Sequence, residues 1–272
     1  MLRICHLMDY QTRCPSDPTI PLALPGPGDV NRLFEHITTN PEFNSKYNIT
    51  IHSKPHSTST TTDVSNINNG VPVYDDGPWI ITVDDFLTDA EADRLIAIGA
   101  EEGYLNSIDF IADKASGNRT SKQTWCKGKC VEDATMQAVD ARIEELLGIS
   151  SQNFEYFQLL KYEQGEFYRE HNDYNPVHLQ KQTGVRILTV FLYLNTVEEG
   201  GGTSFPRLQH LTVTPTKGRV LIWPSVLDED PNRQDDRTYH EALPVEKGVK
   251  YGANVWVHQR DYRKSYNYGC TY

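Results

Sequence analysis

Apolar segments of strand length, separated by glycine and polar turns, fill the second half of the chain. The longest covers residues 184–195 (GVRILTVFLYLN) and is rich in β-branched and aromatic residues, which is typical of a buried strand. Shorter segments of the same kind follow at 211–214, 219–223, 239–242 and 245–258. Short strands punctuated in this way predict a mainly β fold, either a sandwich or a barrel.

Two segments with helical spacing precede these strands. A predicted strand at residues 79–83 leads to the first helix, 89–102, where Thr88 and Glu91 form the signature of a capping box. The second predicted helix covers 133–147 and places five apolar side chains on one face: Met136, Val139, Ile143, Leu146 and Leu147. Because apolar stripes of this kind nearly always pack, we expect both helices to brace the β structure.

The first 75 residues differ from the rest of the chain. They are dense in Pro, Ser, Thr and Asn, as in HSKPHSTSTTT, and contain few apolar residues. Such a composition buries too little surface to offset the entropy lost on ordering. We therefore predict a mostly disordered tail at 1–75, with a short helix at 30–37. The other boundaries place a helical support region at 76–150, a β core at 151–263 and a tail at 264–272.

Composition and charge narrow the possible partners. The chain has 272 residues, which is enough for one large domain with an appendage. It carries 26 basic and 37 acidic residues, a formal net charge of -11 at pH 7. This balance argues against a nucleic-acid partner and fits a protein that handles neutral or basic peptides. No apolar run reaches transmembrane length, so we expect no membrane span.

Three residues form a candidate metal site. His171 and Asp173 lie in YREHNDY, whose aromatic residues favour an extended conformation. Because side chains alternate along a strand, both would point to the same face. His240, from a distant strand, would complete two imidazoles and one carboxylate, the ligand set of a non-heme Fe(II) oxygenase. A His-x-Asp pair alone is weak evidence, since a solvated strand face has the same pattern.

Five segments between residues 79 and 261 carry a family resemblance: QLLKYEQGEFYREHNDY, GVRILTVFLYLNTVEEGGGTSFP, GRVLIWPS, TYHEALPVEKGVKYGANVWVH and RDY. They resemble the 2-oxoglutarate- and Fe(II)-dependent dioxygenases, specifically the prolyl 4-hydroxylase branch of plants, algae and animals. The resemblance implies a double-stranded β-helix, or jelly roll, with helices supporting one side. It also implies that 76–150 contains the substrate loop and that 151–263 is the dioxygenase core.

The resemblance also implies roles for single residues. His171, Asp173 and His240 would hold the iron and form the catalytic centre. Lys250, ten residues after the second histidine, would bind the far carboxylate of 2-oxoglutarate, and its compact charge suits that task. Without this context, Lys250 would be taken for a solvated surface charge. Tyr162 would line the co-substrate pocket, with a core tyrosine as the equally weighted alternative.

Three further residues match substrate-binding positions of that family. Arg119 begins an RTS segment that resembles part of a mobile loop closing over the peptide. Arg186 and Trp256 match positions in the substrate channel. Each has a structural alternative: a loop charge for Arg119, an ion-pair partner for Arg186 and a core aromatic for Trp256.

The cysteines bear on the cellular compartment. Cys126 and Cys130 form a C-x3-C pattern, which is either a disulfide clip or half of a zinc site. A disulfide would imply an oxidising lumen. The sequons at Asn48 and Asn118 point the same way, towards the endoplasmic reticulum. Relatives of this branch usually carry an N-terminal signal, and the first residues here are not a convincing one, so an incomplete start or a cytosolic protein is the alternative. The other cysteines have no obvious partners: Cys5, Cys14 and Cys270.

The leading hypothesis is therefore an enzyme of the procollagen-proline 4-dioxygenase type. As the resemblance implies, it would use Fe(II), 2-oxoglutarate, dioxygen and ascorbate to hydroxylate peptidyl proline at C4, releasing succinate and CO2. Its partner would be a proline-containing peptide or protein. Two alternatives stay open: the same oxygenase chemistry on another side chain or a small molecule, and a non-catalytic jelly-roll binding module.

Overall fold

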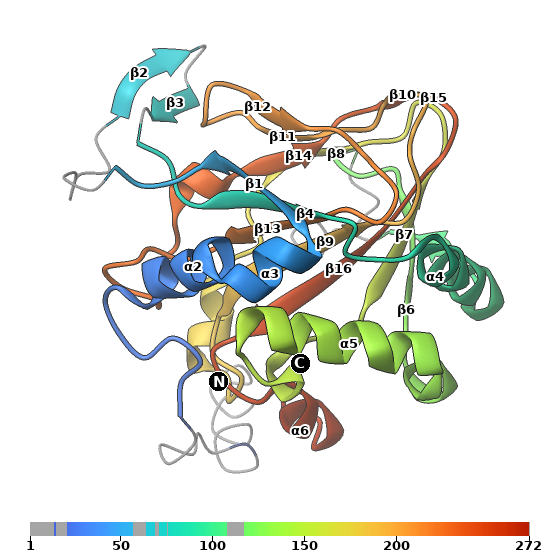
Figure 1. Cartoon of the computed structure of the whole chain (residues 1–272), viewed down its shortest axis with the longest axis horizontal. Coiled ribbons are helices and arrows are strands. Elements are labelled where there is room, and N and C mark those ends of the chain that lie inside the picture. Colours follow the sequence, from blue (N-terminus) through green and yellow to red (C-terminus); the bar gives the residue numbers. More distant parts are fainter. Residues whose placement is uncertain are drawn as a thin grey trace, which may run out of the picture.

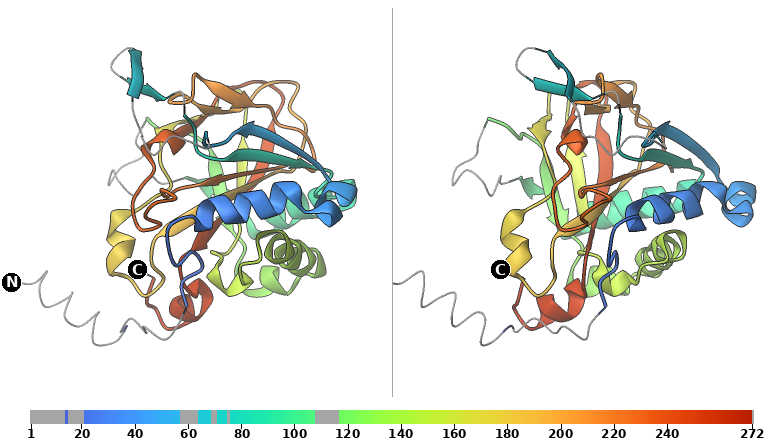
Figure 2. Two further views of the ribbon diagram at one scale, coloured as in Figure 1. Left: turned by 60° about the vertical axis from the view of Figure 1, so that its left-hand side comes forward. Right: turned by 90° about the vertical axis from the view of Figure 1, so that its left-hand side faces the viewer.

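Two antiparallel β-sheets face one another, and helices gather on the outer side of the larger sheet (Figure 1). Two further views show the same layers (Figure 2). The computed structural model describes residues 14, 21–56, 64–68, 71–74, 76–107 and 117–271. This arrangement is the predicted double-stranded β-helix, and the mainly β fold with supporting helices is confirmed.

The order of strands in space differs from their order in the chain. The larger sheet runs β1 (Asn48–Ser53), β4 (Ile80–Asp84), β13 (Val220–Pro224), β9 (Arg186–Tyr193), β16 (Lys250–His258), β7 (Gln158–Tyr162), β6 (Lys122–Trp125) and β5 (Leu105–Asn106). The smaller sheet runs β12 (Leu211–Val213), β11 (Thr203–Phe205), β14 (His240–Ala242) and β8 (Tyr168–His171). Short pairs flank them: β10 (Glu199–Gly200) with β15 (Val245–Lys247), and β2 (Val64–Asn68) with β3 (Val71–Tyr74). Connections include the 3-10 helices η1 (Gly128–Glu132), η2 (Ser151–Asn153), η3 (Pro176–Gln180) and η4 (Asp236–Thr238).

Both predicted support helices are present. Helix α4 (Asp89–Glu102) begins after Thr88, whose side chain forms the predicted capping box with Glu91. Helix α5 (Ala134–Leu147) begins after Asp133, which caps it, and ends at Gly148 in the left-handed conformation. The predicted apolar face of α5 is buried throughout. A side-chain oxygen at the first cap satisfies backbone N–H groups that the helix itself leaves unpaired, so local sequence fixes where both helices start.

The central strands are buried on both faces, and their side chains alternate between two environments. One face of β16 joins the apolar core that also contains α4 and α5, through Ala253, Val255 and Val257. The other face lines a cavity between the two sheets, through Lys250, Asn254 and Trp256. Period-two alternation therefore decides which residues of this strand can meet a ligand.

The N-terminal region is folded where the structure describes it, so the predicted disorder of 1–75 is wrong for residues 29–53. Helix α2 (Asp29–Thr39) confirms the helix expected at 30–37, and α3 (Pro41–Lys46) and β1 follow it. The average composition is polar, but the few apolar residues share one helix face and are buried: Val30, Phe34 and Ile37. Other parts of the expected tail lie outside the described residues: 1–13, 15–20, 57–63, 69–70 and 75.

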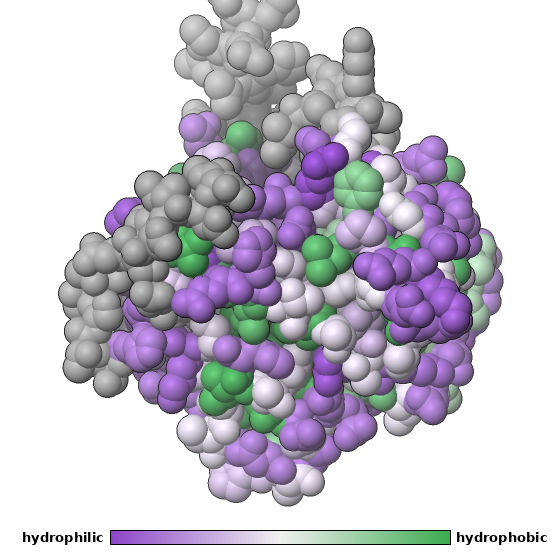
Figure 3. All heavy atoms as spheres, turned by 90° about the horizontal axis from the view of Figure 1, so that it is seen from above, coloured by the Kyte–Doolittle hydropathy of each residue, from purple (hydrophilic) through white to green (hydrophobic). Residues whose placement is uncertain are grey.

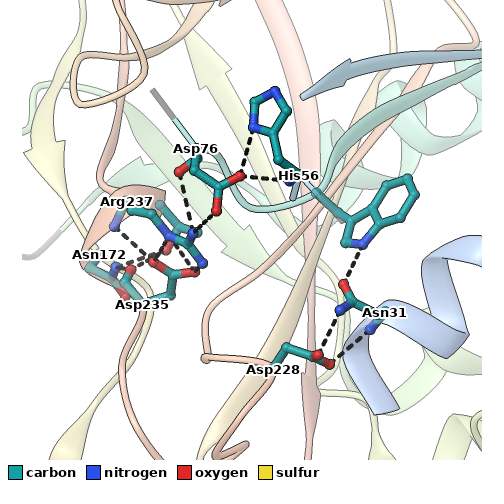
Figure 4. A network of polar contacts seen from close by, with 9 residues as sticks. Asn31, His56, Asp76, Asn172, Asp228, Asp235 and Arg237 are labelled. Carbon is teal, nitrogen blue, oxygen red and sulfur yellow. Dashed lines mark hydrogen bonds and ion pairs between the residues drawn. The ribbon is translucent and has the colours of Figure 1, made fainter. Parts of the chain in front are cut away.

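Contacts with the later chain hold α2 in place. The ring of Phe34 stacks on Trp79 with 5.6 Å between centroids. Asn31 accepts a hydrogen bond of 2.8 Å from Nε1 of Trp79 and donates one of 2.6 Å to Asp228. Figure 4 shows Asn31 and Asp228 side by side. These partners lie far along the chain, so the sequence of the first 75 residues could not show them.

The cysteines form two bridges in the described part of the chain. Cys126 joins Cys130 with 5.1 Å between their Cα atoms, which is the disulfide alternative of the two predicted for this pair. Cys14 joins Cys270, whose Cα lies 5.6 Å away, and so ties the N-terminal segment to the end of the chain. Helix α6 (Tyr262–Asn267) precedes Cys270 and crosses the boundary expected at residue 263.

Polar residues predominate on the face seen in Figure 3, and the apolar ones there form small separate groups. Large apolar side chains that are exposed include Ile51, Leu105, Val177, Leu179 and Tyr268. Among the helices that the described residues form, none combines the length and the apolar character needed to cross a membrane.

Replacing Phe34 by Ala should lower the free energy of unfolding by about 3–5 kcal/mol, because a fully buried ring that packs on Trp79 would leave a cavity. Ile51→Ala is the control, since Ile51 is 43% exposed on β1 and should cost less than about 1 kcal/mol. Urea unfolding followed by tryptophan fluorescence measures both. Equal, small effects would show that the N-terminal region does not belong to the cooperative fold.

Candidate active site

A cavity of about 440 Å³ lies between the two sheets. Residues from both sheets and from the loops between them form its wall. All the residues that the sequence suggested for a site line this one cavity: Arg119, Tyr162, His171, Asp173, Arg186, His240, Lys250 and Trp256. The fold thus brings together segments that are up to 137 residues apart, counted from position 119 to position 256.

Two histidines and one aspartate converge at one end of the smaller sheet. Strands β8 and β14 pair antiparallel, with His240 directly opposite His171. Nε2 of His171 lies 3.9 Å from Oδ1 of Asp173, and Nε2 of His240 lies 3.6 Å from Oδ2. All three possible ligand atoms lie within 4.8 Å of one another. The predicted convergence of these residues is confirmed, and they could hold a metal ion.

Hydrogen bonds orient the two imidazoles. Nδ1 of His171 lies 2.8 Å from the carbonyl oxygen of Arg169, and Nδ1 of His240 lies 3.0 Å from that of Thr238. A carbonyl oxygen can only accept, so in each ring Nδ1 carries a hydrogen, and Nε2 is the nitrogen that remains to bind a metal. Both Nε2 atoms lie near the carboxylate of Asp173, and a ring held by a hydrogen bond from Nδ1 has the orientation that a metal ligand needs.

The protonation of the cluster also suits a cation. Burial and the neighbouring His240 lower the pKa of His171 to about 3, so this imidazole is neutral at physiological pH. Burial alone would raise the pKa of Asp173, but its surroundings together outweigh burial and hold that pKa below its usual range: His240, His171, Arg186 and the hydroxyl of Thr189. The hydroxyl of Thr189 also donates to Asp173 at 2.6 Å. A neutral imidazole at His171 beside a charged carboxylate at Asp173 suits the binding of a cation.

A buried lysine lies deeper in the same cavity. Lys250 is 1% exposed, and within the described residues its Nζ has no hydrogen-bond partner. The rings of Tyr162, Phe191 and Tyr193 surround it, with centroids 5.2–5.5 Å from Nζ. Burial lowers the pKa of Lys250 to about 7. An ammonium left without a partner in an aromatic wall is suited to bind an anion.

Tyr162 lies beside this lysine, as its predicted place in the pocket requires. It is the pairing partner of Lys250 between β7 and β16. It is 3% exposed, and burial raises the pKa of its hydroxyl group. Tyr162 belongs to the core cluster between the sheets and also lines the cavity.

Arg186 and Trp256 lie together in the wall. The guanidinium of Arg186 stacks on the Trp256 ring with 3.8 Å to its centroid. Arg186 also forms an ion pair of 2.6 Å with Glu155, whose other partner is His258 at 2.7 Å. Although burial opposes ionisation, Arg186 and His258 hold the pKa of Glu155 well below its usual range. No motif in the sequence points to Glu155 and His258, because these residues meet only through strand pairing.

Arg119 also lines the cavity. Its guanidinium is over the ring of Tyr168, 4.6 Å from the centroid, and its Nε donates to Ser121 at 3.0 Å. The RTS segment is thus in place at the cavity wall. Residues 108–116, which precede it in the expected substrate loop, lie outside the described residues.

The chain is similar to several known proteins. The model of the 2OG-Fe(II) oxygenase superfamily matches residues 157–258. Prolyl 4-hydroxylase 1 of Arabidopsis thaliana is 31% identical over 201 residues, covering 67% of this chain and 70% of that protein. Prolyl 4-hydroxylase subunit alpha-3 of Bos taurus is 30% identical over 203 residues, covering 71% of this chain and 36% of that protein.

A solved structure shows the same likeness. The viral collagen prolyl hydroxylase of Paramecium Bursaria Chlorella virus-1, in its 2OG complex, superposes with a TM-score of 0.54 and 28% identity. The superposition covers 66% of this chain and 95% of that chain.

Replacing Lys250 by Met should raise the free energy of unfolding of the cofactor-free protein by about 1–4 kcal/mol near pH 6, because Met removes an unpaired buried charge. The folded-state pKa of about 7 lies below the ordinary value of 10.5, so unfolding takes up a proton between these values. The stability of the natural protein therefore rises with pH over this range, and the advantage of Met should shrink.

Urea unfolding at about pH 6 and about pH 9 measures both effects, under conditions where the ionisation of Lys250 differs between the two. Lys250→Arg is the matched control, because a guanidinium keeps its charge and should give no gain. A Met variant that is no more stable than the natural protein would show that this ammonium carries no unfavourable burial.

Proposed function

Because this chain belongs to the prolyl 4-hydroxylase family of 2OG-Fe(II) oxygenases, we propose that it hydroxylates peptidyl proline at C4, with release of succinate and CO2. It is an Fe(II)- and 2-oxoglutarate-dependent dioxygenase. The observation that carries the proposal is the convergence, in one cavity, of a two-histidine, one-carboxylate cluster and an unpartnered buried lysine.

The residues present fit both cofactors. His171, Asp173 and His240 would hold Fe(II), because neutral imidazoles and a carboxylate suit this ion and three protein ligands leave positions open. Lys250 would bind the far carboxylate of 2-oxoglutarate, which would give the buried ammonium an anionic partner. Together, Fe(II) and 2-oxoglutarate supply the oxidising chemistry, in which dioxygen is consumed and one oxygen atom goes to the substrate.

The protein's own task is to position and shield. Thr189 and the backbone carbonyls fix the orientation of the three ligands before any metal arrives. Aromatic residues of the wall, including Phe191 and Trp223, restrict the access of bulk water to the reacting atoms. A peptide that enters the cavity would meet Arg119, Arg186 and Trp256 in its wall, and we propose these three as substrate-binding residues.

We further propose that ascorbate keeps the iron ferrous and that the protein works in the lumen of the endoplasmic reticulum. Asn48 and Asn118, the two sequon residues, are exposed and so accessible to glycosylation. Disulfides persist in oxidising compartments, which supports the location through the pairs Cys14–Cys270 and Cys126–Cys130. A loss of mass on deglycosylation of the protein from its native cells is expected, and free thiols at all four cysteines would contradict the location.

The purified, iron-loaded protein should convert 2-oxoglutarate to succinate under air with ascorbate, and a proline-rich peptide should stimulate this turnover and gain one oxygen atom on proline. His171→Ala should abolish iron-dependent succinate formation, because it removes one of the three ligands. His36→Ala, at an exposed position of α2, is the matched control and should leave turnover unchanged. Succinate and peptide mass are measured together.

Each outcome separates the alternatives. Succinate without peptide oxidation would keep the oxygenase and overturn the proline assignment in favour of another side chain or a small molecule. An iron-bound protein that forms no succinate with any peptide would favour the non-catalytic binding module. Normal turnover in His171→Ala would contradict the ligand assignment itself.

A further inference from the structure

The two segments that carry the metal ligands have little backbone pairing to hold them together. Strands β8 and β14 are short, and their register shifts between His240 and Ala242. His171 ends its strand and Asp173 lies beyond it. The distance between the first ligand segment and the second therefore depends on side-chain contacts as well as on the ladder.

Asn172, between the two ligands of the first segment, bridges to the second segment. Its Nδ2 donates to the carbonyl oxygen of Asp235 at 3.1 Å and to the hydroxyl oxygen of Thr238 at 3.0 Å. Its Oδ1 accepts from the backbone N–H of Tyr174 at 2.7 Å. Thr238 in turn supplies the carbonyl that orients His240. One amide thus connects both ligand segments: two of its hydrogen bonds reach the second segment, and the third fixes the amide within the first.

A buried ion pair holds the other side of this bridge. Arg237 and Asp235 are 7% and 1% exposed, and the guanidinium makes a two-pronged contact with the carboxylate at 2.9 and 2.7 Å. Arg237 also reaches the carbonyl oxygen of Asp76 at 3.3 Å, and Asp76 binds the ring of His56 at 2.9 Å. Figure 4 shows this chain of contacts leading to Asn172.

The energetics of the pair favour a role in geometry over a role in stability. Removing two charges from water costs free energy that their mutual attraction often fails to recover, so an apolar pair of similar volume would stabilise the fold as well or better. A planar guanidinium fork, however, fixes both distance and angle in a way that apolar packing does not. The ion pair therefore fixes the conformation of the turn at 235–238, which precedes His240.

We propose that Asn172 and the Arg237–Asp235 pair are positioning residues, which hold the two ligand segments at the separation that the metal requires. They do not contact the metal themselves; they act through the backbone of Thr238 and the ring of His240. Without the bridge, the ligands would still be present, but the metal would have to draw the two segments together on binding. Metal affinity and the electronic environment of the metal should then both change.

The same chain offers a matched control. Asn31 also bridges two segments through its amide, with Asp228 and Trp79 as partners, and Figure 4 shows it away from Asn172. Asn31→Ala removes the same number of atoms as Asn172→Ala and cuts hydrogen bonds of the same kind. It should reduce stability without affecting the metal.

The experiment measures Co(II) binding to the full chain by calorimetry, together with the visible spectrum of bound Co(II). Asn172→Ala should weaken Co(II) binding by about 10- to 100-fold and shift the spectrum, as loss of a residue that orients metal ligands does. Asn31→Ala should bind within about twofold of the natural protein. Thermal midpoints of the metal-free proteins are recorded to compare the structural cost of each change.

Two gentler variants cover the case in which Asn172→Ala does not fold. Thr238→Val keeps the side-chain shape but removes the hydroxyl that joins Asn172 to Asp235, and Arg237→Lys keeps the charge but loses the fork. Both should weaken Co(II) binding in the same direction. Natural affinity and an unchanged spectrum in these variants would overturn the proposal, and so would an equal loss in Asn31→Ala.

The inference rests on the proposed function only for the identity of the metal. A natural protein that binds Co(II) but, when loaded with iron instead, forms no succinate would contradict the proposed function and leave the positioning test valid. A natural protein that hydroxylates its peptide, beside an Asn172→Ala variant with unchanged metal affinity, would contradict the positioning role alone.

Discussion

The alternation of side chains along strands that are covered on both faces is the constraint on which the rest of the molecule depends. Helices cover one face of β16 and the second sheet covers the other, so neither face of its centre is open to the bulk solvent. A polar residue there must therefore face the cavity. The same period puts Phe191 and Tyr193 of β9 and Trp223 of β13 around Lys250 and the metal cluster. The cavity wall is a direct product of strand register.

The cavity wall carries charges that a stable fold does not need. Lys250 is buried without a partner, and Glu155 is buried between Arg186 and His258. Desolvation makes each of these groups unfavourable or at best neutral for folding. The stability that tolerates them comes from the apolar core shared by the sheet and its helices. Burial of charges that destabilises the fold at the site, offset by stabilising apolar packing in the core, is typical of an active site. There function determines the residues, and packing elsewhere compensates.

Much of the fold followed from local sequence patterns. The bounds of α4 agree with the predicted helix 89–102, whose start is marked by a capping box. The predicted strands followed from apolar runs between turns. The N-terminal segment was misjudged because its mean composition is polar, whereas its stability depends on where three apolar side chains lie and on Trp79, far along the chain. Composition averages over the positions that decide packing.

The residues of the candidate site also differ in how far the sequence could indicate them. His171, Asp173, His240 and Lys250 stand in motifs at fixed spacing, so the sequence alone could indicate them. The partners that support them could not be found in that way. Asn172 contacts Thr238, and Glu155 contacts His258, only because distant strands pair. The sequence around these residues does not indicate their partners. Motifs reveal the groups that do chemistry, and the tertiary structure reveals the groups that hold them.

Charge shows how far whole-chain properties can be from those of a site. The net charge of -11 favoured neutral or basic peptides as partners. Among the described residues of the cavity wall, however, Glu155 and Asp173 are the acidic ones, and both are already engaged. The basic side chains of the wall are more numerous: Arg119, Lys127, Lys181, Arg186 and Lys250. Solvent screens the surface acids over roughly 8–10 Å, whereas a ligand inside the cavity meets the wall directly. The local balance of charge, and not the total, must therefore govern which ligand is bound.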